Sequence, residues 1–301
     1  PERALMHTQR RITPFFFLTP AVLVLALVGI YPLLFAAWVS LHTYLLAQPN
    51  IPHDLVGFGN YLTVLRDPSF WGAIGRTLFY LAVALPLEVV LGLGIAFLLR
   101  RGPWGRLRGL TRVALVIPLA MTPVVTGLIG RLIFNQDFGV ANYLQSRLTG
   151  NKVGIEWLGN PTLAFVTILL LEIWQWTPFA ALIFLSGLTA VPAEVEEAAT
   201  LETRSFWVML RSIQLPFLLP ALTAILILRT ADILKQFDMV YTLTGGGPGS
   251  STELINLYIT RIGLRGAFDQ GIASAQAILM LVLTTILSRL YIRYLYKGDS
   301  A

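Results

Sequence analysis

The segment Glu197-Ala198-Ala199-Thr200-Leu201-Glu202-Thr203, continued by Ile213-Gln214-Leu215-Pro216, is the long polar, helix-forming stretch between two strongly apolar parts of the chain. Pro192 precedes it and suits the first turn of a helix, where a missing N–H costs nothing. Glu194 and Glu196 then lie near the positive N-terminal end of the helix dipole. Residues 192–216 are therefore predicted to form a polar helical segment between two membrane spans.

The composition places the chain in a membrane. Of its 301 residues, 55% are hydrophobic and 13% are charged, whereas soluble domains carry about 25% charged residues. The chain has no cysteine, which excludes disulfides and thiolate catalysis. The net charge of +6 does not indicate nucleic-acid binding, because the basic residues cluster in short loops beside apolar spans.

Several apolar stretches reach the about 20 residues that an α-helix needs to cross a bilayer. They cover about residues 13–41, 71–99, 110–134, 161–188, 216–235 and 271–294. No soluble domain or fixed-period repeat interrupts them. The sequence therefore predicts an all-α polytopic membrane protein with six transmembrane helices. Residues 1–301 are expected to form one transmembrane domain, with the 192–216 segment between spans four and five.

The distribution of basic residues predicts the orientation. An even number of spans puts both ends of the chain on one side, and most arginines and lysines then fall on that side. These are Arg3, Arg10, Arg11, Arg100, Arg101, Arg106, Arg108, Arg112, Arg204, Arg211, Arg289, Arg293 and Lys297. Cytoplasmic loops of membrane proteins carry such an excess. Both termini and the 192–216 segment are therefore expected in the cytoplasm, in a multi-pass protein of the bacterial inner membrane.

The polar segment resembles the EAA motif of bacterial ABC-importer permeases, written E-A-A-x3-G-x9-I-x-L-P. Glu197, Ala198 and Ala199 match it, as do Ile213, Leu215 and Pro216, while Thr203 stands where that family usually has glycine. Because threonine disfavours the positive φ that glycine allows, the sequence does not decide the backbone conformation at Thr203. An ordinary amphipathic interfacial helix is the alternative. The resemblance implies docking to an ATPase subunit through Glu197, Ala198, Ala199, Glu202, Thr203, Ile213, Leu215 and Pro216.

Polar side chains inside the apolar spans are the candidates for a transport pathway, because they are costly in lipid and usually face a cavity or a partner. The candidates are Glu88, Trp174, Gln175, Trp176, Thr177, Phe179, Arg229, Asp232 and Gln236. The spacing predicts that the last three share one helical face. Aromatic rings beside hydrogen-bonding groups suit a sugar. Membrane anchoring or packing of the tryptophans, and a structural Arg229–Asp232 pair, remain alternatives. Glu88 or Glu172 is expected to neutralise Arg229.

The fifth span and the loop after it resemble the carbohydrate-uptake branch of these permeases, which imports oligosaccharides, polyols and glycerol phosphate. The segments that carry this resemblance are residues 229–238 and 241–249. On composition alone, the glycines and proline near residue 247 indicate a flexible turn. The resemblance implies that Thr244, Gly245, Gly246, Gly247 and Pro248 lie where a solute-binding protein docks.

The resemblance also implies the partners. They are a second homologous permease, two copies of an ATPase subunit, an extracytoplasmic binding protein and a sugar-like substrate. The chain has no G-x4-G-K-[S/T] loop, so ATP and Mg are expected on the ATPase subunit. No catalytic constellation or metal-binding motif is evident, and this chain is expected to bind no cofactor or metal. An ion-coupled secondary transporter is the rival function, and an intramembrane enzyme is disfavoured.

Overall fold

The computed structural model of the protein describes residues 18–48, 50, 52–101, 107–151, 153–203 and 205–295. Residues 13–17 of the predicted first span lie outside this part, as do Arg3, Arg10, Arg11, Arg106, Arg204 and Lys297 of the predicted cytoplasmic set. The chain divides into two compact units, formed by residues 1–67 with 259–279 and by residues 68–258 with 280–301. The single domain expected from the sequence stays a prediction.

The first unit contains the first span and short helices beside it. A helix runs from Leu18 to Ser40 through the π-turn η1 (Ala26–Ile30) and α2 (Tyr31–Ser40). The helix α3 (Gly59–Arg66) is joined to its end, because Asn60 donates to the carbonyls of Ser40 and His42 at 2.9 Å each. The unit also holds the π-turn η3 (Arg261–Arg265) and the first turns of α14 (Gln270–Leu295).

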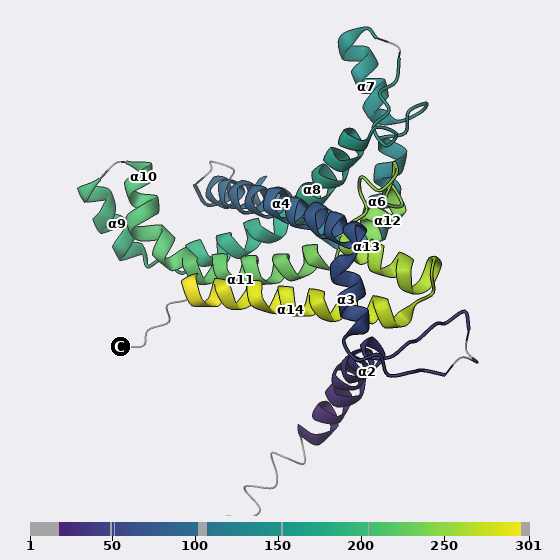
Figure 1. The fold of residues 1–301 in the computed structure, drawn as a ribbon. Helices are drawn as coiled ribbons and strands as arrows, with labels where there is room; N and C mark the ends of the chain where they lie inside the picture. Colours follow the sequence, from purple (N-terminus) through teal and green to yellow (C-terminus); the bar gives the residue numbers. More distant parts are fainter. Residues whose placement is uncertain are drawn as a thin grey trace, which may run out of the picture. The chain divides into compact units, whose positions relative to one another are not determined.

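The second unit is built on three long helices that pack against one another, α4 (Pro68–Arg101), α8 (Pro161–Thr189) and α11 (Leu215–Leu234). Figure 1 shows α9 and α10 of this unit beyond one end of α11. In a membrane, close packing of side chains and hydrogen bonds between helices hold such helices together. One core cluster between them consists of Ala96, Phe97, Leu99, Ala180, Phe184, Leu185, Leu188, Leu218 and Ile225. The predicted second, fourth and sixth spans agree with α4, α8 and α14 to within a few residues.

The third predicted span is bent, a feature that the sequence did not indicate. It consists of α5 (Leu107–Ala120) and α6 (Pro123–Ile133), and residues 113–120 and 123–133 meet at a bend of 98°. A proline disfavours the helical region for the residue before it. Thr122 accordingly has extended backbone angles (φ −72°, ψ 149°), and its side chain caps α6. The described residues thus hold five spans by length and composition, or six if this bent pair is one span.

Three segments that the sequence indicated as loops contain short helices. They are α3, α7 (Val140–Thr149), and the pair α12 (Asp238–Leu243) and α13 (Ile255–Thr260). Long-range contacts support them. The buried Asn142 of α7 receives hydrogen bonds from the indole of Trp157 at 2.9 Å and the amide of Ile155 at 3.1 Å. Such contacts are absent from local sequence, so helices this short are missed.

The polar segment forms α9 (Ala193–Glu202), α10 (Phe206–Met209) and the π-turn η2 (Leu210–Gln214). The helix that contains the predicted fifth span begins before Pro216, because one helical run extends from Phe206 to Leu234. Pro216 cannot donate a backbone hydrogen bond, but the π-turn before it has already changed the hydrogen-bond register. The helix therefore passes through the proline.

Thr203 needs no glycine-like conformation. Its backbone is extended (φ −144°, ψ 139°), and its hydroxyl accepts a hydrogen bond from the Ser205 amide at 3.1 Å. Thr203→Gly is therefore expected to change the free energy of unfolding by less than about 1 kcal/mol, since only chain entropy and one exposed hydrogen bond differ. Thermal unfolding in detergent measures this. A loss of several kcal/mol would show that the threonine side chain has a further role.

Candidate functional site

A buried ionic cluster joins the three long helices of the second unit. Arg229 of α11 donates from Nε to Glu88 Oε2 at 2.8 Å and from Nη2 to Glu88 Oε1 at 2.9 Å, a bidentate pair with α4. The same Nη2 donates to Glu172 Oε1 of α8 at 2.5 Å. All three side chains are buried. The prediction that Glu88 or Glu172 neutralises Arg229 is confirmed, and both do so.

Gln236 completes this cluster from outside the helix that was predicted to carry it. The helix α11 ends at Leu234 with Lys235 as its C-cap, so Gln236 does not share a helical face with Arg229 through an i, i+7 repeat, and that expectation is wrong. Its side chain nevertheless returns to the cluster, where Nε2 donates to Glu172 Oε2 at 2.6 Å. The turn after α11 brings the amide there.

Asp232 lies at the edge of the cluster. Its Oδ2 is 3.7 Å from Arg229 Nη1, and its side chain is 50% exposed. A structural Arg229–Asp232 pair is therefore not the main interaction of Arg229, which has two closer carboxylates.

A cavity of about 200 Å³ opens beside the cluster. Its lining residues are Pro123, Glu172, Trp176, Arg229, Asp232, Lys235, Gln236, Phe237 and Asp238. Pro123 is the first residue of α6, so the bend after α5 forms part of the wall. The cavity offers carboxylates, two cations, an amide and aromatic rings within one space. Such a set can hydrogen-bond to a polar solute and pack against its apolar faces.

The aromatic candidates of α8 do not act together. Trp176 lies on the cluster, with the guanidinium carbon of Arg229 4.3 Å from its ring centre, a cation–π contact. It also meets Phe179 edge to face. Trp174 is 46% exposed and does not line the cavity. A helix turns about 100° per residue, so Trp174 and Trp176, two residues apart, point in nearly opposite directions.

The two remaining candidates of α8 are buried. Gln175 donates from Nε2 to the carbonyl of Met121 at 2.8 Å, and it therefore braces the bend between α5 and α6. Thr177, two residues further along α8, is also buried.

Lys235, Phe237 and Asp238 are cavity residues that the sequence interpretation did not select. Phe237 stacks on Tyr241, with ring centres 5.4 Å apart and planes 5° from parallel. Their position in the sequence could have indicated this role, because they follow Arg229 and Asp232 in a polar run at the end of an apolar span.

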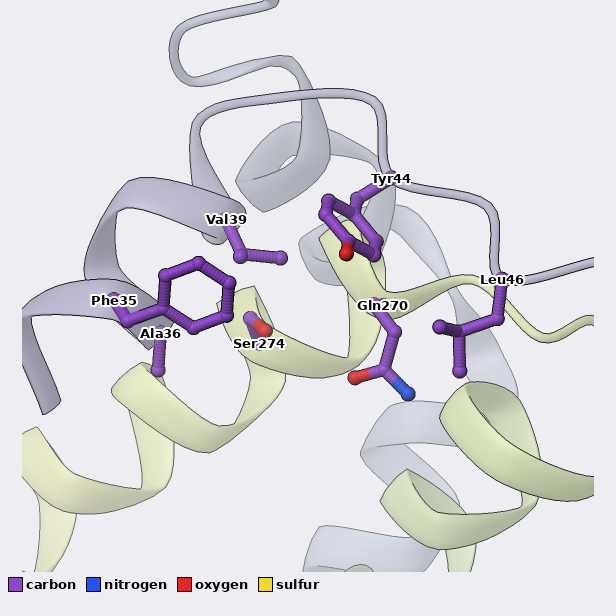
Figure 2. Close-up of a pocket in the computed structure, with 7 residues that line it drawn as sticks. All are labelled: Phe35, Ala36, Val39, Tyr44, Leu46, Gln270 and Ser274. Atoms are coloured by element: carbon purple, nitrogen blue, oxygen red, sulfur yellow. The ribbon is translucent and has the colours of Figure 1, made fainter. Parts of the chain in front are cut away.

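The first unit contains a cavity of its own, of about 280 Å³. Figure 2 shows the side chains that line it, which are Phe35, Ala36, Val39, Tyr44, Leu46, Gln270 and Ser274. The ring of Tyr44 also stacks on His53, with centres 4.3 Å apart. None of the lining residues is charged. This cavity therefore lacks the ionic groups that distinguish the one in the second unit.

The glycine-rich segment after α12 forms a turn, as predicted, and hydrogen bonds hold it in place, while its predicted flexibility stays a prediction. Gly245 and Gly246 have φ of 64° and 94°, values that residues other than glycine rarely adopt. The hydroxyls of Thr244 and Thr252 lie 2.7 Å apart, and Thr252 donates to the Gly247 carbonyl at 2.8 Å. Pro248 follows and is half-buried. The turn presents a defined surface beside the end of α12.

The polar segment presents only part of its predicted docking set. Glu197, Ala198, Glu202 and Pro216 are exposed, whereas Thr203, Ile213 and Leu215 are half-buried. Ala199 is buried, with 5% of its surface accessible. The expectation that Ala199 is a small residue open to another protein is therefore wrong, because it packs against its own chain.

Apolar helices long enough to span a membrane, arranged around a polar, ionic cavity, define a polytopic membrane protein. The chain belongs to the family described as binding-protein-dependent transport system inner membrane component, whose family model matches residues 55–298. This confirms the resemblance to ABC-transporter permeases that the motif indicated.

Relatives and solved structures agree. The chain is 36% identical over 279 residues to the trehalose/maltose transport system permease protein MalF of Thermococcus litoralis, which covers 93% of this chain and 92% of the relative. It is 33% identical over 289 residues to the sulfoquinovosyl glycerol transport system permease protein SmoG of Agrobacterium fabrum, covering 96% and 92%. A crystal structure of a bacterial ABC transporter involved in the import of the acidic polysaccharide alginate matches with a TM-score of 0.83 at 19% identity, covering 99% of this chain and 100% of that one. That likeness supports the fold.

Proposed function

We propose that the protein is a permease subunit of an ATP-driven, binding-protein-dependent importer for a sugar. It forms half of a translocation pathway with a second homologous permease. Two copies of an ATPase subunit, which carry ATP and Mg, dock on the cytoplasmic side, and an extracytoplasmic binding protein delivers the substrate. The observation that carries this proposal is the ionic cavity of the second unit in a chain of this permease family.

A sugar is the favoured substrate. The two relatives named above are described as transporting trehalose/maltose and sulfoquinovosyl glycerol, which both contain sugar rings. The cavity supplies what such a ring needs, because carboxylates and an amide bind hydroxyls while aromatic faces pack on C–H groups. The oligosaccharide, polyol and glycerol-derivative classes all meet this description.

The coupling site is proposed at α9. Its exposed Glu197, Ala198 and Glu202 are available to an ATPase subunit, while Thr203, Ile213, Leu215 and Pro216 shape the return into α11. Closure of the ATPase pair would displace α9 and bias the spans between inward-open and outward-open states. The turn Thr244–Gly245–Gly246–Gly247–Pro248, on the opposite side in the predicted topology, is the proposed contact for the binding protein.

An ion-coupled secondary transporter is the rival, with Glu88, Glu172 and Asp232 as proton carriers. Proteoliposomes containing the complete complex and the binding protein distinguish the two. We expect uptake of radiolabelled trehalose or maltose to require ATP inside the liposomes and to persist when a protonophore collapses the proton gradient. Uptake driven by a proton gradient without ATP would reject the ABC-importer mechanism.

Asp232→Ala tests the pathway role of the cavity. Arg229 keeps Glu88 and Glu172, so assembly and thermal stability should stay near those of the native complex. Uptake per assembled complex should fall about tenfold, because loss of a charged partner at a polar contact costs about 1.5 kcal/mol or more. Uptake and complex yield are measured on one preparation. Lower yield with unchanged uptake per complex would instead assign Asp232 a structural role.

The orientation has a direct test, because the chain contains no cysteine. Single cysteines at Ser250, in the glycine-rich turn, and at Ser300, near the C-terminus, should react oppositely with a membrane-impermeant maleimide in intact cells. Ser250→Cys should be labelled and Ser300→Cys should be labelled only after the membrane is opened. Equal labelling of the two in intact cells contradicts cytoplasmic termini.

A further inference from the structure

The carboxylate of Glu196 joins three elements at the end of the second unit that carries α9. Its Oε2 accepts a hydrogen bond from Arg100 Nη2 of α4 at 2.7 Å. Its Oε1 accepts a hydrogen bond from Gln214 Nε2 at 2.9 Å, at the last residue of the π-turn η2. Both oxygens therefore accept hydrogen bonds, one from α4 and the other from the helical run formed by η2 and α11.

Glu196 and Glu197 have different surroundings although they are neighbours in sequence. Glu197 is exposed on α9 and free for a partner protein, whereas the Glu196 side chain is 25% exposed and faces its own chain. Successive residues of a helix point about 100° apart, which explains the difference. The EAA motif begins at Glu197, so Glu196 lies outside it.

The helices that Glu196 joins are also joined deeper in the membrane. Glu88 precedes Arg100 by twelve residues on α4, about 18 Å along the helix, and Arg229 follows Gln214 by fifteen residues, about 22 Å. The Glu88–Arg229 pair therefore connects the same two helical runs at the level of the cavity. Two cross-links on one pair of helices resist their sliding or splaying.

The π-turn η2 lies between α9–α10 and α11, where the helix could bend when α9 moves. π-turns often occur at functional sites within helices, and here η2 stands between α9–α10 and α11. The Gln214–Glu196 hydrogen bond spans it, from the end of η2 back to α9. The bond therefore ties α9 directly to the last residue of η2.

We infer that Glu196 is a positioning residue that transmits displacement of α9 to α4 and α11 together, and so to the cavity. This inference rests on the proposed function. The Arg100–Glu196 pair is partly exposed, at 20% and 25% of the side-chain surfaces, and partly exposed pairs add little to folding stability. Loss of Glu196 should therefore uncouple the cavity from the ATPase without unfolding the protein.

The test follows the cavity itself and needs no knowledge of the sugar. Because the chain lacks cysteine, Asp238→Cys places one thiol in the cavity wall. The complex is purified with its ATPase through a tag on this chain and reconstituted, and the rate of maleimide labelling is measured with and without a non-hydrolysable ATP analogue. In the Glu196 background, we expect the analogue to change that rate by roughly tenfold, as for a ligand-driven two-state shift. In the Glu196→Ala background, we expect little change while the ATPase is still recovered.

A charge exchange and a matched control complete the experiment. Arg100→Glu alone should reduce the response, because it breaks the link to α4. Arg100→Glu with Glu196→Arg should restore most of it, because the Gln214 amide can rotate to accept from the new guanidinium. Glu194→Ala, an exposed position on the same helix, should keep the full response. A full response in Glu196→Ala, or a double exchange no better than the single changes, would overturn the inference. Absence of any nucleotide response in the native background would instead reject ATP-driven coupling and the proposed function with it.

Discussion

Replacement of Arg229 by alanine is expected to lower the midpoint of thermal unfolding in detergent by roughly 10 °C, because removal of one partner from a buried ion pair costs about 3–5 kcal/mol. The substitution leaves Glu88 and Glu172 buried with no compensating cation at hydrogen-bond distance. Trp176 would also lose the guanidinium that covers its ring. The yield of assembled complex should fall in parallel.

Two further variants separate this explanation from a simple loss of packing. Asp232→Ala, three residues along the same helix, should leave the midpoint nearly unchanged because Asp232 is half exposed. Arg229→Met combined with Glu88→Gln and Glu172→Gln should recover most of the stability, since replacing a whole buried ionic group is often neutral. If the triple variant is as unstable as Arg229→Ala, uncompensated charge is not the cause.

The second large effect is expected from Glu197→Lys. Glu197 is exposed on α9, so the reversal should leave the permease folded and inserted. At a protein contact it should cost several kcal/mol, which is a loss of affinity of about a hundredfold or more. Co-purification of the ATPase subunit should fall accordingly, and ATP-dependent uptake should be lost.

Asp137→Lys is the matched control for this reversal. Asp137 is also exposed but follows α6, on the opposite side of the membrane in the predicted topology. Recovery of the ATPase with Asp137→Lys should equal that of the native chain. Undiminished recovery together with normal uptake in Glu197→Lys would remove Glu197 from the proposed contact.

Much of the fold could be predicted from the sequence because the bilayer imposes a strong local signal. A spanning helix satisfies all its backbone hydrogen bonds within one segment, so length and apolarity are enough to locate it. The spans that became α4, α8 and α14 were located in this way. The same reasoning marked Glu88, Glu172 and Arg229, since an ionisable side chain within a span requires a partner. The gapped motif from Glu197 to Pro216 placed the chain among ABC permeases.

The remaining features depended on contacts between distant residues. Local sequence did not show that Thr122 and Pro123 would turn the third span through 98°, with Gln175 bracing the bend. It also placed Gln236 on the same helical face as Arg229, whereas the end of α11 at Leu234 and the turn after it bring that amide to Glu172.

The sequence by itself determined the class of the protein, the spans that form α4, α8 and α14, and the need to neutralise Arg229. Hydrophobic length and buried charge have energetic costs that each segment or residue carries by itself. Only the tertiary structure decided which side chains neutralise the buried charge and where they lie. It brought Glu88 and Glu172 from two other helices to Arg229, and it left Asp232 at the edge of a cavity. It also turned Glu196 inward beside an exposed Glu197. The physical reason is that packing and charge pairing act through space, between residues 57 to 141 positions apart in this cluster.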